Sequence, residues 1–284
     1  MNHGDGAAAD SDRAVFALTP PVGAAAPFVG AAAPFVFASP HSGTLIPDDM
    51  GADPALSDIQ INSAGDALMD RLIAAGPMRG APLIAARITR AYVDLNRAPE
   101  DLDPLLIDGV DAASGPKTAA GYGVVPRLTG AGQPLHARRL TLAEARGRIA
   151  RAHAPYHAGL ARLMEAAKAT HGRAVLVDWH SMPGRAGGVD VVLGDRHGTS
   201  CRPVLTRRFK ALFEKQGFSV ALNHPYAGGW STQTWGRPDQ RFEAIQVEIS
   251  RALYLDAGGG PSAGWGRCAA ALNQVIAELL RPGG

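Results

Sequence analysis

The stretch that organises this chain is Ala174-Val175-Leu176-Val177-Asp178-Trp179-His180-Ser181-Met182-Pro183, in which an apolar run ends in a cluster of polar side chains. An apolar, β-branched run of this length predicts a buried strand. Open α/β sheets bind their ligands beyond the carboxyl ends of the strands. The Asp178–His180 pair therefore indicates one of two things. It forms a metal or acid–base site, or it belongs to a turn in which Asp178 accepts bonds from backbone amides and His180 is an ordinary hydrogen-bonded histidine.

Segments with strand-like and helix-like patterns alternate on both sides of this stretch. Thr141 and Glu144 have the spacing of a capping box for a long helix, which Pro155 is predicted to kink. The pattern predicts an α/β fold, a single domain with a mostly parallel mixed sheet and helices on both faces. Strands are expected at 35–38, 82–88, 92–95, 174–180, 189–193, 219–222 and 244–249, and helices at 57–75, 142–169, 203–216 and 263–280.

Composition excludes several classes of protein. The 284 residues are 46% hydrophobic and carry a formal net charge of +2. Lysine and arginine are scattered, which does not favour nucleic-acid binding, and no apolar run is long enough for a membrane span. Cys201 and Cys268 do not suggest a disulfide scaffold, and the N-terminus lacks the basic start of a secretory signal. We expect a soluble cytoplasmic protein, of an oligomeric state that the sequence does not specify.

The first 34 residues are predicted to form a flexible arm. Residues 1 to about 14 are small, polar and acidic, which predicts disorder. An exact tandem duplication of seven residues follows, at 22–28 and 29–35. Two copies are too few for a solenoid, so we interpret the duplication as a lengthening of the arm. The ordered domain is expected to span residues 35–284.

Three side chains of metal-binding type fall at or just after predicted strand ends: His41, Asp66 and His180. A catalytic zinc ion typically takes three such ligands and leaves a fourth position for water. Asp70 lies one helical turn after Asp66 and competes for the same role. The dispersed spacing is not diagnostic by itself, because such sets need the fold to bring them together.

Asn96 and Arg97 close the predicted strand at 92–95. An arginine can bind a carboxylate with two parallel hydrogen bonds, and an adjacent amide can add another. A structural arginine paired with Asp94 or a nearby acid explains the same pattern equally well. The sequence therefore leaves both interpretations open.

Glu248 shares the polar face of its predicted strand with Gln246 and Ser250. Such a glutamate is commonplace on an edge strand, and the sequence by itself favours that interpretation. In a covered central strand, burial would raise the pKa of the carboxyl group, which suits a general base acting on metal-bound water.

Several loop and helix residues have less specific patterns. His224 lies in an Asn-His-Pro turn and is interpreted as a residue that orients other groups rather than as a metal ligand. Gly229 and Trp230 permit close backbone approach and offer an aromatic wall, or they form only a tight turn. Most of the other histidines, at positions 136, 153, 157 and 171, are expected on the surface or on helices.

Five motifs, taken in order, resemble the N-formylglutamate amidohydrolase family. They are Ser39-Pro40-His41-Ser42-Gly43, the segments 92–97 and 178–183, Asn223 to Trp230, and Gln246 to Arg251. The resemblance extends from about residue 36 to residue 256. It implies a fold similar to the zinc carboxypeptidases, a phosphorylase/hydrolase-like fold. It also implies a zinc-dependent enzyme that hydrolyses N-formyl-L-glutamate to L-glutamate and formate, late in histidine breakdown.

The resemblance also implies roles for individual residues. Asp66 is preferred to Asp70 because it matches the acidic position of the family's helix motif. Ala67 and Trp179 depart from the residues that are more usual at their positions, which bears more on the substrate than on the metal. The implied roles are zinc ligation by His41, Asp66 and His180, general-base catalysis by Glu248, carboxylate binding by Asn96 and Arg97, and an orienting contact from Asp178.

The expected mechanism adds an arginine that stabilises the oxyanion, and Arg127 in the long loop at 98–135 is the nominee. The substrate is expected to be a small N-acyl amino acid. Two alternatives remain. A carboxypeptidase-like hydrolase of peptides or peptidoglycan fragments would use the long, open loop. A non-catalytic binding protein on the same fold would have no need of Glu248 as a base.

Overall fold

The computed structural model describes residues 15–23, 33–184 and 187–281. The described chain divides into two compact units. Unit 1 comprises residues 15–17, 40–65 and 85–159, and unit 2 comprises residues 18–23, 33–39, 66–84, 160–184 and 187–281. Residues 1–14 of the predicted arm, and most of its duplicated segment, lie outside the described residues. Within the arm, Phe16–Thr19 form a strand, β1.

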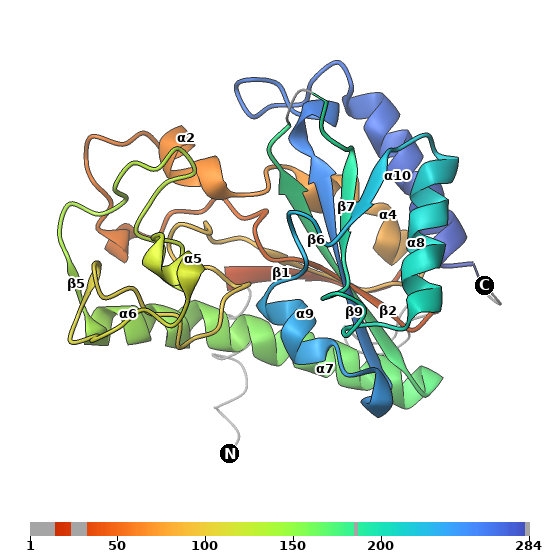
Figure 1. Ribbon diagram of the computed structural model, residues 1–284, viewed down its shortest axis with the longest axis horizontal. Coiled ribbons are helices and arrows are strands. Elements are labelled where there is room, and N and C mark those ends of the chain that lie inside the picture. The colour runs from red at the N-terminus through yellow and green to blue at the C-terminus, as the bar shows by residue number, and fades with distance from the viewer. Residues whose placement is uncertain (1–14, 24–32, 185–186, 282–284) are drawn as a thin grey trace. The chain divides into compact units, whose positions relative to one another are not determined.

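The architecture is a mostly parallel mixed sheet with helices, as the sequence predicts (Figure 1). The strand order is β1-β3-β2-β6-β9-β7-β8. Strand β6 pairs in parallel with β2 and with β9, whereas β7 is antiparallel to β9. The other strands of this sheet are β2 (Phe35–Ser39), β3 (Leu83–Ala86), β6 (Ala174–Met182), β7 (Val191–Gly194), β8 (Val220–Leu222) and β9 (Phe242–Ser250).

The centre of the sheet consists of β6 and β9, in which every residue is buried. Strands covered on both faces are typically near-continuous apolar runs, and β6 begins with such a run at Ala174. Its Trp179 packs edge-on against Phe37 of β2 and against Phe213 of a later helix, with ring centroids 5.4 and 6.4 Å apart. Trp179 is therefore a core residue.

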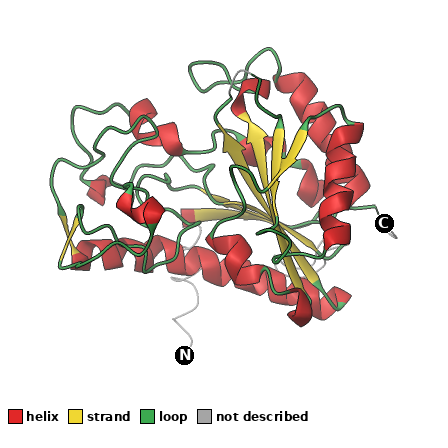
Figure 2. Ribbon diagram, viewed as in Figure 1, coloured by secondary structure: helices red, strands yellow, loops and turns green. Residues whose placement is uncertain are grey.

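Helices cover the sheet within unit 2 (Figure 2). The apolar face of α8 (Pro203–Lys215) buries Phe209 and Phe213, and α10 (Trp265–Leu279) buries Leu272 and Ile276. Both helices lie within one residue or two of their predicted ranges. A shorter helix, α9 (Trp230–Trp235), follows the glycine-rich loop.

The predicted helix at 57–75 is wrong, because the chain breaks it into short pieces. The pieces are α2 (Asp58–Ile61), a 3-10 turn at Asn62–Ala64, α3 (Met69–Leu72) and α4 (Ala75–Met78). Gly65 is extended, and Leu68 is left-handed with φ 61°. These conformations interrupt the backbone ladder, so Asp66 lies between helices rather than on one.

The long predicted helix at 142–169 is present as a continuous helical run. Thr141 and Glu144 form the expected capping box, since each backbone N–H is bound by the other's side chain. The run comprises α6 (Leu142–Arg148), a π-helical turn (Ile149–His153) and α7 (Ala154–His171). The π turn ends at His153, two residues before Pro155, whose nitrogen has no proton to donate to the helical hydrogen bonds.

The other parts of unit 1 are mostly irregular. The predicted strand at 92–95 is wrong, because these residues form turns around the backbone bond from Asp94 N–H to the Val124 carbonyl. The predicted long loop at 98–135 contains only short elements. The remaining elements are β4 (Ile107–Asp108), β5 (Leu140–Thr141), α5 (Pro116–Ala119) and the 3-10 turns Asp48–Met50, Pro238–Gln240 and Arg251–Leu253. Among the described residues, no helix has the length and apolar character needed to cross a membrane.

Candidate active site

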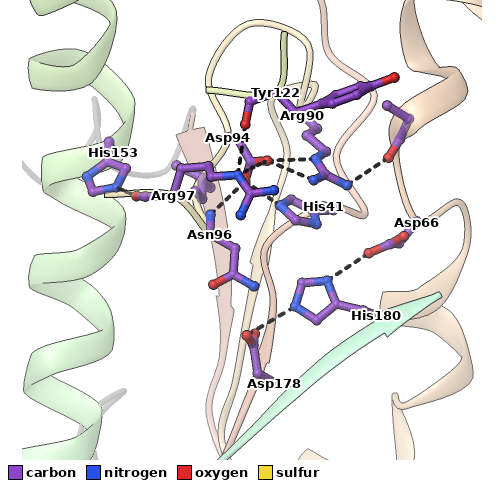
Figure 3. A network of polar contacts seen from close by, with 12 residues as sticks. His41, Asp66, Arg90, Asp94, Asn96, Arg97, Tyr122, His153, Asp178 and His180 are labelled. Carbon is purple, nitrogen blue, oxygen red and sulfur yellow. Dashed lines mark hydrogen bonds and ion pairs between the residues drawn. The ribbon is translucent and has the colours of Figure 1, made fainter. Parts of the chain in front are cut away.

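His180 lies at the carboxyl-terminal part of β6, between two carboxylates of unit 2 (Figure 3). Its Nδ1 is 3.0 Å from Asp66 Oδ2, and its Nε2 is 3.0 Å from Asp178 Oδ2. Burial lowers the pKa of the imidazole, but the charges and hydrogen bonds of Asp178 and Asp66 outweigh it and hold the pKa of His180 well above its ordinary value. The pair of carboxylates therefore fixes the ring and favours a positive charge at this point.

Asp66 is held from its other side. Its Oδ1 accepts a hydrogen bond from Ser181 Oγ at 2.9 Å and another from Arg251 Nη2 at 3.3 Å. Arg251 Nε also donates to Ser181 Oγ at 2.9 Å. One carboxylate oxygen is thus occupied by these donors, and the other faces His180.

Glu248 lies directly beside His180, because the two residues are register partners on β6 and β9. Strand β9 has β7 on its other side, where Val192 is paired with Glu248. The edge-strand interpretation of Glu248 is therefore wrong: the glutamate lies in the covered centre of the sheet and is only 6% exposed. Gln246 Nε2 donates to its Oε1 at 2.7 Å, so the carboxylate has a neutral hydrogen-bond partner within its own strand.

The polar cluster of unit 1 is organised around Asp94, a buried carboxylate (Figure 3). Its Oδ1 is 2.7 Å from His41 Nε2, and its Oδ2 accepts a bond from Arg90 Nε at 2.9 Å. Burial raises the pKa of the carboxyl group, but Arg90 and His41 outweigh it and hold the pKa of Asp94 well below its usual range. Asp94 is therefore an anion that fixes His41.

The next residues of this cluster are Asn96 and Arg97. The Asn96 backbone N–H donates to Asp94 Oδ1 at 2.8 Å. Arg97 Nε donates to the Tyr122 carbonyl at 2.9 Å and lies 3.9 Å from Asp94 Oδ2. The structural ion pair between Arg97 and Asp94 that the sequence suggested is thus present. Together with the Tyr122 carbonyl, it holds the Nε atom of the guanidinium group in place.

His41, Asp66 and His180 form a possible metal-binding set. One ligand atom from each of the three lies within 4.8 Å of the other two. Asp70, the competing residue, is in α3 and does not belong to this set.

The remaining candidate residues of the site have few contacts that bear on their expected roles. Arg127 forms an ion pair with the buried Asp103, at 2.8 Å from Nε to Oδ2. His224 is exposed and precedes a cis peptide bond to Pro225. Gly229 caps α9, where its carbonyl accepts a bond from Thr232, and Trp230 begins that helix half-buried. The roles expected for Arg127, His224, Gly229 and Trp230 stay predictions.

Two histidines that the sequence reasoning treated as ordinary helix residues contact the backbone of the Asn96–Arg97 segment. His153 Nε2 is 2.9 Å from the Arg97 carbonyl, and His157 Nε2 is 2.8 Å from the Leu95 carbonyl. Their spacing of four residues, which places side chains on one helix face, was the available signal.

The sequence of this chain matches a family model described as N-formylglutamate amidohydrolase over residues 33–255. The chain belongs to the N-formylglutamate amidohydrolase family. It is 34% identical over 210 residues to a Pseudomonas aeruginosa protein named N-formylglutamate deformylase, covering 71% of this chain and 74% of that protein. A Pseudomonas putida protein of the same name is 30% identical over 186 residues, covering 62% of this chain and 65% of that protein.

One solved structure supports this membership, and a second shares only the fold. The crystal structure of an N-formylglutamate amidohydrolase from Ralstonia eutropha JMP134 superimposes with a TM-score of 0.85 at 34% identity, covering 94% of this chain and 97% of that one. A gene product from Agrobacterium tumefaciens shares the fold at 17% identity, with a TM-score of 0.67 and coverage of 95% of this chain and 96% of that one.

Proposed function

We propose that this protein hydrolyses the amide bond of N-formyl-L-glutamate to release L-glutamate and formate, with one zinc ion bound by His41, Asp66 and His180. The observation that supports it most directly is the pairing of Glu248 with His180 in the centre of the sheet. It gives a chain of this family a buried carboxylate next to a candidate metal ligand. A protein that only binds its ligand has no need of such a base.

The donor set fits a zinc ion. Two imidazoles and one carboxylate are typical of catalytic zinc sites. Each histidine has Nε2 at a buried aspartate, Asp94 for His41 and Asp178 for His180. In metal sites such a carboxylate fixes the tautomer and the ring orientation, so that the other ring nitrogen binds the metal. We assign this orienting role to Asp94 and Asp178.

A bound zinc ion supplies Lewis-acid chemistry and lowers the pKa of a coordinated water to about 7. Glu248 accepts a proton from the attacking water as the new C–O bond forms at the formyl carbon. It then passes that proton to the amide nitrogen, and the C–N bond breaks to release the amine of glutamate. Gln246 holds Glu248 in place during both transfers.

The other residues bind and orient the substrate in this proposal. Asn96 and Arg97 donate to a substrate carboxylate, since the arginine supplies a planar pair of N–H groups and the asparagine adds an amide donor. Arg127 stabilises the oxyanion. Gly229 and Trp230 line the substrate site, and His224 orients a neighbouring group. The reaction belongs to the late part of histidine breakdown and takes place in the cytoplasm.

The deciding experiment measures metal content and then the amine released by hydrolysis, with formate measured as well for the N-formyl substrates. Purified protein is analysed for zinc and assayed with N-formyl-L-glutamate, N-acetyl-L-glutamate, other N-formyl amino acids, a peptide and a peptidoglycan fragment. We expect about one zinc per chain, and amine release that is fastest with N-formyl-L-glutamate and is matched by an equal amount of formate. Chelation is expected to abolish turnover and added zinc to restore it. Preferential cleavage of the peptide or the peptidoglycan fragment would refute the proposed substrate, and full activity without metal would refute the proposed cofactor.

A further inference from the structure

Four polar groups of the backbone around Asn96 form hydrogen bonds within unit 1. The Asn96 N–H donates to Asp94 Oδ1 at 2.8 Å, and the Arg97 N–H donates to the Asp94 carbonyl at 3.3 Å. The carbonyls on either side of Asn96, those of Leu95 and Arg97, face two ring nitrogens of the adjacent helical run, at 2.8 and 2.9 Å. The turn is therefore fixed through both its N–H groups and its carbonyls.

We propose that His153 and His157 are positioning residues that hold the Asn96–Arg97 turn so that its side chains present their donors to the substrate carboxylate. This inference rests on the proposed function, because it assigns a supporting role for the same substrate. The two histidines bind backbone atoms of the turn, and their effect on substrate affinity passes mainly through Arg97, the charged donor of the turn.

Both histidines lie on one continuous helical run, four residues apart. His153 ends the π-helical turn, Pro155 follows within the first turn of α7, and His157 lies four residues after His153. The two rings lie close together, with centroids 4.3 Å apart and planes at 39°. Residues four apart share a helix face, so a single face supplies both donors to the two carbonyls of the turn.

Hydrogen-bond chemistry fixes the proton on each ring. A carbonyl oxygen only accepts, so each Nε2 must carry a proton. Burial, followed by the neighbouring His153, lowers the pKa of His157 to about 3, and burial lowers the pKa of His153. Both rings are therefore neutral donors at physiological pH. They fix the turn without adding a positive charge that would compete with Arg97 for the substrate carboxylate.

The alternative to positioning is a purely structural role, and a double-mutant cycle separates the two. His157→Leu removes the donor, whereas His157→Gln keeps an N–H that can reach a carbonyl. Each is made alone and together with Arg97→Ala, and kcat and KM for N-formyl-L-glutamate are measured with full-length, zinc-loaded enzyme. His171→Leu, near the end of the same helix, is the matched control.

We expect His157→Leu to raise KM about 10- to 100-fold with kcat within about twofold, since a misplacement of about 1 Å can cost up to about 100-fold. His157→Gln is expected to restore most of the affinity, and His153→Leu and His153→Gln to behave in the same way. In the Arg97→Ala background the additional effect of His157→Leu should largely vanish, because residues that act through one another are non-additive.

Two results are decisive against the inference. Equal effects of His157→Leu in the wild-type and Arg97→Ala backgrounds would show that the histidine does not act through Arg97. A loss confined to kcat would also contradict it. If the wild-type enzyme releases no formate from N-formyl-L-glutamate, the proposed function falls and the inference falls with it, an outcome that the parent enzyme alone reveals.

Discussion

His180 and Glu248 are register partners on the two fully buried central strands, β6 and β9. Parallel pairing sets neighbouring strands about 4.8 Å apart, so backbone geometry alone keeps a candidate metal ligand and a candidate base side by side. Side chains on such strands lie on rigid elements, which position groups more precisely than loops do. This pairing is the structural basis for the first prediction.

Glu248→Gln is expected to keep the fold and the metal but to lose almost all turnover. The amide has the same shape as the carboxylate but cannot accept a proton from water. Removing a general base typically lowers kcat by about 10²–10⁴-fold. The measurements are steady-state formate release and zinc content by elemental analysis. Glu278→Gln, which neutralises the α10 partner of Lys215, is the control and should match the wild type. Wild-type turnover in Glu248→Gln would rule out the base.

Asp66→Asn and Asp70→Asn are expected to differ in metal content. Asp66 lies 3.0 Å from His180 and accepts bonds from Ser181 and Arg251, whereas burial raises the pKa of Asp70 within α3. Asp66→Asn should therefore lose stoichiometric zinc, as should His180→Ala, while Asp70→Asn retains it. Zinc titration with a competing chelator measures the affinities. Zinc loss in Asp70→Asn together with full retention in Asp66→Asn would reverse the assignment.

The sequence predicted the elements whose pattern reflects a single local property. The apolar run before Asp178 was a central strand, and the Thr141–Glu144 capping box began a helix, because burial and capping both act over a few residues. The helix predicted through Asp66 was wrong because the break in it depends on tertiary structure rather than on a local pattern. Its apolar periodicity was present, but the extended Gly65 and the left-handed Leu68 belong to a tertiary turn that periodicity does not encode.

The candidate site shows the same limit. His41 and His180 became candidates because each lies at or just after the end of a strand-like run. The strand pattern alone favoured an edge position for Glu248, because alternation along one strand does not show what lies on either side of it. Its central place depends on β6 and β7, which are distant in sequence. The contact of His157 with Leu95 was missed because the two residues come from segments 62 positions apart.

Trp179 is expected to contribute to stability rather than to substrate choice. It is fully buried and packs against Phe37 and Phe213, and its ring N–H has no hydrogen-bond partner among the described residues. Trp179→Ala should lower the free energy of unfolding by about 3–5 kcal/mol, as measured by urea denaturation. Trp179→Phe keeps an aromatic ring and removes the unsatisfied N–H, so it should cost less. A change in acyl-group preference with unchanged stability would contradict this assignment.

Stability is expected to fall in mildly acidic solution because of two buried histidines of unit 1. Burial lowers the pKa of His157 to about 3 and that of His136 to about 4, below the value of about 6.5 in an unfolded chain. Between these values the unfolded chain binds a proton that the folded protein does not. The free energy of unfolding is therefore unaffected above about pH 6.5 and decreases as the pH falls, by up to about 1.4 kcal/mol per pH unit for each histidine.

His157→Gln removes one of these groups and keeps an N–H for the Leu95 carbonyl. Urea denaturation at pH values from 7 to 4.5 should therefore give a shallower decline in the free energy of unfolding than in the wild type, and His136→Gln combined with His157→Gln a shallower one still. Since glutamine does not titrate, the difference between the variants isolates proton binding from packing. An identical slope in wild type and His157→Gln would mean that His157 is protonated to the same extent in the folded and unfolded chains.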